Sequence, residues 1–297
     1  MEGGSIGSRT ARARSALLDF GRSHPTGAAG GAILCLIILL VALAPIISPF
    51  RFDRTVGRQL LPPVSEATLE EGTLWLGSDE LGRDLVSRLL YGGRVSMFVG
   101  IMAPLIGVAF GTVLGIASAY FGKVFDLLVQ RVVDTVLILP GIVVAMTITV
   151  AFGFTVPVVI VALAVSFSAS SVRVVRSRAL TLSEMQYVEA ARALGSTDTR
   201  IIFRHLVPNS LPVSMVLVAV SVGGAITAEA ALSFLGIGIQ PPIPSWGNML
   251  TRAQASFDLA PHIAIAPGMA ITIVVLAINL FGDSLRDVLD PRLRNVR

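Results

Sequence analysis

Apolar runs of membrane length, separated by short charged segments, dominate the chain. Charged residues are absent from five long intervals, namely those between Arg22 and Arg51, Arg94 and Lys123, Asp134 and Arg173, Arg204 and Glu229, and Asp258 and Asp283. A span needs about 20 apolar residues at a rise of about 1.5 Å each, so the third interval is long enough for two spans. The pattern predicts six transmembrane helices, at Ala28–Ser48, Val95–Tyr120, Thr135–Phe152, Val156–Val172, Asn209–Leu235 and His262–Gly282.

Composition agrees with an all-α integral membrane protein. Hydrophobic residues make up 54% of the chain and charged residues 14%, against about 25% charged in soluble domains. The net charge of +4 comes from basic residues beside the spans, where lipid and topology explain them better than nucleic acid does. Cys35 is the only cysteine and lies inside the first apolar run, which excludes a disulfide framework or a thiolate metal cluster within the chain.

The first apolar run follows a basic tail, residues 1–27, as the h-region of a signal peptide would. The run from Gly27 to Ile47 is longer than the roughly 7–15 residues of an h-region, and Pro45 and Pro49 stand where a small-residue cleavage site would be. We expect an uncleaved first transmembrane helix, residues 28–48.

Basic residues near the span ends predict the orientation. They place residues 1–27, 173–208 and 283–297 in the cytoplasm, with six arginines in the second segment and four in the third. Residues 49–94 and 237–260 are then extracytoplasmic, although the first of these carries six arginines of its own. Residues 95–282 form a five-helix core that includes the cytoplasmic loop 173–208.

The outer segment 49–94 is predicted to contain an interfacial amphipathic helix. Ser78 is a candidate cap, and Asp84 and Arg88 have the spacing of an ion pair on a helix. Leucines recur on one face at Leu81, Leu85 and Leu89. In the second outer segment, the proline-rich GIQPPIPSWGNM predicts a rigid loop with Trp246 at headgroup depth.

Two carboxylates near the membrane invite an ion-coupled interpretation, Asp134 and Glu229. Asp134 opens the third predicted span at its cytoplasmic end. Glu229 follows Asn209 by about 20 residues, roughly 30 Å along a helix, and so lies near the outer surface. For Glu229 we favour the role of a structural partner at the outer end of the bundle. Lining the mouth of the pathway is the second alternative, and ion coupling is the third. Ser233 and Trp246 join Glu229 as candidates for the outer mouth.

No motif for enzymatic chemistry is visible. Lys123 is the only lysine and is followed by Val124, where a phosphate-binding loop requires Ser or Thr. The three histidines do not form HExxH, and no GxSxG occurs. We therefore expect no catalytic residue, no metal site and no ATPase site in this chain.

The cytoplasmic segment TLSEMQYVEAARALGSTDTRIIFRHLVPN predicts a helix, a turn and a second helix. Ser183 is expected to cap the helix Glu184–Leu194, Gly195 to end it in a left-handed conformation, and Ser196 or Thr197 to cap a second helix that reaches His205. Pro208 then starts the next span.

Small side chains on the first of these helices favour docking of a partner. Ala190 and Ala191 allow close approach to the backbone, and Glu189 and Arg192 provide polar contacts. A passive helix on the membrane surface and a DNA-binding helix-turn-helix are the alternatives, the latter disfavoured by spans on both sides. The candidate coupling residues are Glu184, Tyr187, Val188, Glu189, Ala190, Ala191, Arg192, Leu194, Gly195 and Pro208.

This segment resembles the EAA motif of ABC importer permeases, in EAARALG followed by HLVPN, with His205 and Val207 departing from the usual residues. Three further strings, LGSDELGRDLVSRLLYGGRVS, ALSFLGIG and PPIPSWGNML, look like the second permease subunit of the dipeptide, oligopeptide and nickel importer family.

The resemblance implies a type I ABC importer permease fold in a bacterial or archaeal plasma membrane. It implies four partners: a second permease, two ATPase subunits that hold ATP and magnesium, and an external binding protein that delivers peptides. A nickel or other metal-chelate importer is the alternative within the family. A secondary transporter would need ion-binding residues at a broken helix, and the only such break, Pro140-Gly141, carries no charge. A membrane enzyme lacks a nucleophile or metal set.

Overall fold

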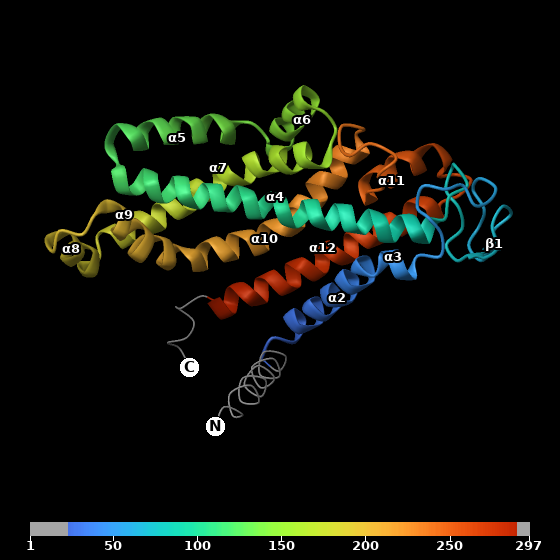
Figure 1. Cartoon of the computed structure of the whole chain (residues 1–297), viewed down its shortest axis with the longest axis horizontal. Helices are drawn as coiled ribbons and strands as arrows, with labels where there is room; N and C mark the ends of the chain where they lie inside the picture. The colour runs from blue at the N-terminus through green and yellow to red at the C-terminus, as the bar shows by residue number, and fades with distance from the viewer. Residues whose placement is uncertain (1–22, 290–297) are drawn as a thin grey trace.

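Helices that run back and forth along one axis form the protein (Figure 1). The computed structural model describes residues 23–289. Its long helices are α2 (Pro25–Ala42), α4 (Leu85–Phe121), α5 (Lys123–Ile138), α6 (Gly141–Phe152), α7 (Val156–Ser183), α10 (Val207–Phe234) and α12 (His262–Leu289). Shorter elements are α3 (Ala44–Ile47), β1 (Ser65–Glu66), β2 (Thr73–Leu74), α8 (Gln186–Ala193), α9 (Asp198–Ile201), a π-helical turn (Ile202–Leu206), α11 (Trp246–Ala253) and a 3-10 turn (Gln254–Ser256).

Five stretches of helix in this part of the chain are long and apolar enough to cross a membrane, and α5 with α6 makes a sixth if that pair counts as one span. The two helices of the pair meet at an angle of 93°. A single straight span at Thr135–Phe152 is therefore wrong. Pro140 has no N–H to continue α5 and forces Leu139 before it into extended backbone, with φ −84° and ψ 140°.

Several helices extend beyond the predicted spans. Helix α4 begins at Leu85 rather than Val95, and α7 continues to Ser183 rather than ending at Val172. Helix α9 and the π-helical turn run directly into α10. Apolar runs report only the part of a helix that meets lipid, so polar ends that continue the same hydrogen-bond ladder were missed.

Three glycines pack α4 against α7. Gly107, Gly111 and Gly115 recur every fourth residue and so share one face of α4. A Cβ added at Gly107 would lie 2.5 Å from the carbonyl oxygen of Ala164, and one at Gly115 would lie 2.8 Å from that of Val172. Only glycine permits this approach of two backbones, which is a recurrent means of joining helices in membranes.

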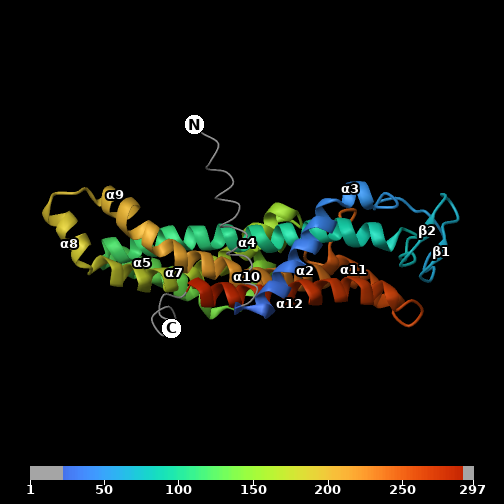
Figure 2. The same cartoon turned by 90° about the horizontal axis from the view of Figure 1, so that it is seen from below.

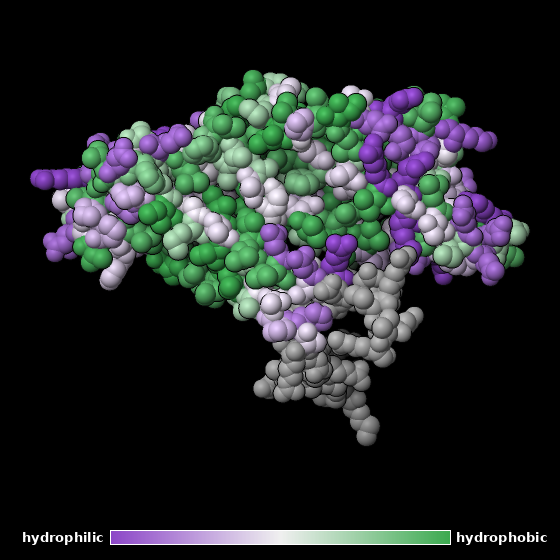
Figure 3. Space-filling model, turned by 180° about the vertical axis from the view of Figure 1, so that it is seen from behind, coloured by the Kyte–Doolittle hydropathy of each residue, from purple (hydrophilic) through white to green (hydrophobic). Residues whose placement is uncertain are grey.

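The two ends of the molecule are formed by different segments of the chain (Figure 2). Helices α8 and α9 lie at one end. At the other end lie α11 and residues 48–84, whose short hairpin pairs Ser65 with Leu74 around a small core of Phe50, Val56 and Leu74. Seen from behind, a broad hydrophobic face separates these more hydrophilic ends (Figure 3), as expected of a chain that spans a bilayer.

The predicted interfacial helix in the outer segment is wrong. Asp84, not Ser78, caps a helix there, and that helix is the first turn of α4 itself. Leu81 precedes it, and Arg88 pairs with Asp79 rather than with Asp84. Only Leu85 and Leu89 lie on a helix, the span α4, which begins ten residues earlier than its apolar run.

The tails predicted to be cytoplasmic fall largely outside the described residues, at 1–22 and 290–297. Helices α2 and α12, which lead to them, lie side by side, and a Cβ at Gly30 would meet the carbonyl oxygen of Ala277 at 2.7 Å.

The glycine contact predicts a position-specific cost. Replacing Gly111 by alanine places a Cβ 2.8 Å from the Ser168 carbonyl oxygen and 3.1 Å from the Val172 nitrogen, so α4 and α7 must separate. We expect Gly111→Ala to lower the free energy of unfolding in detergent by about 1–3 kcal/mol. Gly224→Ala on α10 is the control, since a Cβ there meets nothing within 4 Å. Equal stability of the two variants in a denaturant titration would contradict close packing of α4 on α7.

Candidate functional site

The first candidate site is the helical hairpin of α8 and α9, residues 184–201, hereafter the coupling hairpin. Helix α8 begins at Gln186 after Met185 in extended backbone, two residues later than expected. Ser183 does not cap it, because its hydroxyl donates to the Ala179 carbonyl oxygen at 2.8 Å and thus belongs to α7.

Gly195 ends α8 in the left-handed conformation that the sequence predicted, with φ +76°. Its N–H donates to the Arg192 oxygen at 2.9 Å, and the Ser196 N–H donates to the Ala191 oxygen at 3.0 Å. These two bonds are the pair of a Schellman motif. Thr197 then caps α9, accepting from the Arg200 N–H at 3.4 Å, so that of the two expected caps Thr197 is the one used.

A buried cluster anchors the coupling hairpin to the bundle. Val188 has no exposed surface and packs with Ile201 and with Ile116 of α4. The remaining buried members come from the ends of α4 and α7 and from the π-helical turn: Ala119, Val175, Ala179, Leu182 and Leu206. Val188 therefore holds α8 in place, and its side chain cannot touch a partner while this packing persists.

The opposite face of α8 is free of such contacts. Leu194 is 86% exposed, and Ala191 is half-buried at the edge of the cluster. The other predicted coupling residues are exposed, namely Glu184, Tyr187, Glu189, Ala190, Arg192, Gly195 and Pro208. Of the small residues expected to receive a partner, Ala190 is the more accessible.

Tyr120, at the end of α4, is a residue that sequence reasoning missed. Its hydroxyl donates to Asp198 Oδ1 at 2.6 Å, and the Arg192 guanidinium lies 5.3 Å from the centre of its ring. The ring thus joins both helices of the coupling hairpin to α4. The sequence offered one signal for this role, an aromatic residue two positions before Gly122, where the helix ends. The partners of Tyr120, however, lie 70 or more residues away in the sequence.

The second candidate site lies at the other end of the molecule, where the structure brings Glu229, Ser233 and Trp246 together. Glu229 is fully buried and accepts hydrogen bonds from Ser96 Oγ at 2.9 Å and from Ser233 Oγ at 2.8 Å. The Trp246 backbone N–H donates to the same Ser96 hydroxyl at 3.1 Å. Together these contacts tie α4, α10 and the start of α11.

Trp246 is therefore not an interfacial aromatic, and that expectation is wrong. It is 2% exposed, and its indole N–H donates to the Leu89 carbonyl oxygen at 2.9 Å. Gly93 on α4 leaves room for the ring of Trp246. The other tryptophan of the chain, Trp75, is by contrast 62% exposed. Glu229 and Ser233 are also buried, so all three side chains lie inside this chain.

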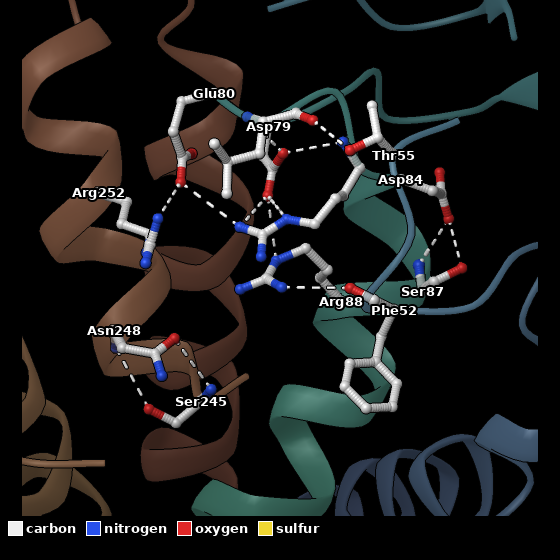
Figure 4. A network of polar contacts seen from close by, with 12 residues as sticks. Phe52, Thr55, Asp79, Glu80, Asp84, Ser87, Arg88, Ser245, Asn248 and Arg252 are labelled. Carbon is white, nitrogen blue, oxygen red and sulfur yellow. Dashed lines mark hydrogen bonds and ion pairs between the residues drawn. The ribbon is translucent and has the colours of Figure 1, made fainter. Parts of the chain in front are cut away.

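A charged network lies beside this cluster (Figure 4). Asp79 Oδ2 accepts a hydrogen bond from Arg83 Nε at 2.7 Å and forms an ion pair with Arg88 Nε at 3.2 Å, and all three residues are at most 5% exposed. Glu80 extends the network to Arg252 of α11, at 3.2 Å. The outer segment, α4 and α11 are thus held by three cations and two carboxylates that share partners.

Asp84 caps α4 at the edge of this network, accepting from the Ser87 N–H at 2.7 Å and from its hydroxyl at 2.6 Å. Burial raises the pKa of the Asp84 carboxyl above its ordinary value, more than these hydrogen bonds lower it. The Ser87 hydroxyl in turn accepts from the Phe50 N–H at 3.1 Å, which fixes the start of the outer segment on α4.

Within residues 23–289, no group of three or more His, Cys, Asp or Glu side chains could hold a metal ion. The carboxylates described above instead accept from serine hydroxyls, backbone N–H groups and arginines.

The structure is a bundle of apolar helices with the coupling hairpin at one end and a polar cap, residues 48–84 with α11, at the other. This architecture is that of a membrane-spanning subunit. The chain belongs to the family of binding-protein-dependent transport system inner membrane components, whose model matches residues 111–295. It is thus a permease subunit of an ABC importer.

Curated relatives are similar over most of their length. The chain is 39% identical to the glutathione transport system permease protein GsiD of Pectobacterium atrosepticum over 286 residues, which is 93% of this chain and 90% of that protein. It is 42% identical over 265 residues, 89% and 87% of the two chains, to a Brucella suis protein provisionally named a peptide transport system permease. It is 40% identical to GsiD of Escherichia coli over 220 residues, 74% and 73% of the two chains.

The charged network predicts that neutralising one carboxylate, that of Asp79, lowers the free energy of unfolding strongly. Asp79→Asn leaves Arg83 and Arg88 buried without their shared carboxylate, a change that costs about 3–5 kcal/mol of unfolding free energy. Asp53→Asn is the control, because Asp53 pairs with Arg51 at the surface, where ion pairs contribute little. If both variants unfold at the parent's denaturant midpoint in detergent, the network does not hold the outer segment.

Proposed function

We propose that the chain forms, with a second and different permease, the membrane path for peptides that an external binding protein delivers. The observation that carries the proposal is the coupling hairpin, which is packed on the ends of α4, α7 and α10 by one face and leaves Ala190 exposed on the other. A force applied to the exposed face would be transmitted to three spanning helices.

Two ABC ATPase subunits are the proposed source of that force. This sequence contains no phosphate-binding loop, so ATP and magnesium belong to the partners. Closure of the ATPases would move the coupling hairpin as a unit and switch the path between outward and inward access. This places the hairpin and both termini in the cytoplasm, and the polar cap of residues 48–84 and α11 outside, in a bacterial or archaeal plasma membrane.

Peptides are the proposed substrate class because the relatives that cover most of the chain are named for glutathione or peptide transport. A nickel or other metal-chelate substrate remains the alternative within the family. The buried Glu229 cluster is proposed to be a fixed brace of the outer end, not an ion-coupling site, since its carboxylate is held by two serine hydroxyls.

Uptake by membrane vesicles that hold the whole transporter tests the proposal. We expect ATP to drive uptake of a labelled dipeptide or of glutathione with binding protein present, and an ionophore to leave it intact. Uptake that an ionophore abolishes would indicate a secondary transporter, and uptake of nickel without peptide would contradict the substrate class.

Variants of the coupling hairpin test the coupling itself. Gly195→Val forces a branched side chain into a left-handed backbone, which costs about 1 kcal/mol or more and redirects α9, and Ala190→Trp enlarges the exposed face. We expect both to assemble in the membrane but to lose most of the peptide uptake and most of the ATPase activity that the binding protein stimulates.

Gly153→Val is the matched control, since Gly153 also has positive φ, +105°, and open space around it, but lies in the α6–α7 connection. Parental uptake by Gly195→Val and Ala190→Trp, with ATPases still bound, would show that the hairpin is a passive loop.

A further inference from the structure

Helices α5 and α7 expose a set of polar side chains that the proposed coupling does not use. The set consists of Asp134 on α5 and of Ser166, Ser170 and Arg173 on α7, and is called the polar seam below. Arg173 Nη2 lies 2.5 Å from Asp134 Oδ1, with the two side chains 54% and 43% exposed. Ser170 is exposed, and Ser166 donates to the Gly141 carbonyl oxygen at 3.0 Å, at the break between α5 and α6.

Exposed apolar side chains lie on both sides of the polar seam, and Arg131 and Thr135, also exposed, adjoin Asp134 on α5. On α5, Val124 is 69% exposed and precedes Asp134 by ten residues, roughly 15 Å along the helix. Val132 and Ile138, on either side of Asp134, are 65% and 80% exposed. On α7, Val161 and Val174 bracket the seam residues and are 53% and 43% exposed. The exposed ion pair thus borders a surface suited to lipid.

A second ion pair between the same helices shows what a purely structural pair looks like here. Asp126 accepts from Arg176 through both carboxylate oxygens and from Ser118 Oγ, and the two charged side chains are 20% and 29% exposed. Two turns further along α5, the Asp134–Arg173 pair is joined by one contact, between Arg173 Nη2 and Asp134 Oδ1, and its side chains are about twice as exposed. The Asp126–Arg176 pair is shielded within the contact between α5 and α7, whereas the Asp134–Arg173 pair leaves its charges accessible.

Charged side chains in membrane spans face a water-filled cavity or the bundle interior, because lipid cannot solvate them. Asp134 and Arg173 are too exposed for the interior of this chain. We propose that the polar seam lines the water-filled translocation path, and that Asp134 and Arg173 contact the ammonium and carboxylate ends of a zwitterionic peptide. The second statement rests on the proposed substrate class, whereas the first does not.

The spacing on α7 fits this role. Ser166, Ser170 and Arg173 follow one another at four and three residues and therefore share one face of the helix. The two hydroxyls donate within the chain, to the carbonyl oxygens of Gly141 and Phe167, so their oxygens can accept from peptide N–H groups. The opposite charges provide a fixed polarity. Such a surface can hold peptides of different side chains without selecting among them.

Cysteine labelling tests the path assignment without reference to substrate. In a Cys35→Ala background, Ser170→Cys and Val132→Cys are each treated in whole-transporter vesicles with a small charged thiol reagent present on both sides. We expect rapid labelling of Ser170→Cys and none of Val132→Cys, which lies on the apolar face of α5. Absence of labelling at Ser170→Cys, or equal labelling at both positions, overturns the assignment.

Substrate selectivity tests the role of the ion pair. The double variant Asp134→Asn with Arg173→Gln removes both charges at nearly constant volume, and Arg51→Gln with Asp53→Asn is the control at the outer surface. We expect the ratio of uptake of a free dipeptide to that of the same dipeptide with blocked ends to fall about tenfold in the first variant only.

An unchanged ratio overturns the contact with the peptide ends. If the parent transporter takes up neither peptide while Ser170→Cys still labels selectively, the proposed substrate class fails and the path assignment stands.

Discussion

The close approach of α4 and α7 is the constraint on which the rest of the structure depends. Three glycines, Gly107, Gly111 and Gly115, bring the two backbones into direct contact. Such packing matters in a lipid bilayer, because apolar side chains gain no free energy by exchanging contacts with lipid for contacts with one another. Both helices continue past this contact to the coupling hairpin, and α4 continues in the other direction to the charged network around Asp79. One packed pair therefore connects the two polar ends.

At one end of the molecule, apolar burial anchors the coupling hairpin, and the Tyr120–Asp198 hydrogen bond adds a polar contact. Val188 fills a pocket among residues of α4 and α7, while Tyr120 and Gly195 set the direction of the two short helices. At the other end, buried charges and the Glu229 cluster add to apolar packing in fixing α11 and residues 48–84. The glycine contact therefore joins α4 and α7 into one body near the hairpin, although Pro104 interrupts the hydrogen-bond ladder of α4 further along. By contrast, a 93° bend at Pro140 separates α5 from α6.

Much of this architecture was predictable from local sequence. Long uncharged intervals indicated an all-α membrane protein, and five of the six spans predicted from them match helices long enough to cross a membrane. Gly195 with the residues around it indicated the helix-turn-helix of the hairpin. What failed depended on distant contacts. Trp246 was placed at the surface because its burial requires Gly93, more than 150 residues earlier in the chain. Arg88 was paired with Asp84 by spacing, but Asp84 is committed to the cap of α4, which leaves Arg88 to Asp79. The bend between α5 and α6 was marked by Pro140-Gly141, yet a proline within an apolar run is compatible with a straight span until its neighbours are known.

The claim that α4 and α7 move as one body is tested most directly by joining them. A Cβ at Gly115 would lie 3.3 Å from Val175 Cβ, close to the roughly 3.5–4.5 Å that a disulfide spans, so Gly115→Cys with Val175→Cys in a Cys35→Ala background provides a reversible link near the coupling hairpin. ATP-driven uptake by vesicles is measured before and after oxidation, and again after reduction. We expect the oxidised transporter to take up substrate at the rate of the reduced one. Loss of uptake on oxidation, with recovery on reduction, would show that the two helices must separate in each cycle and would contradict this account.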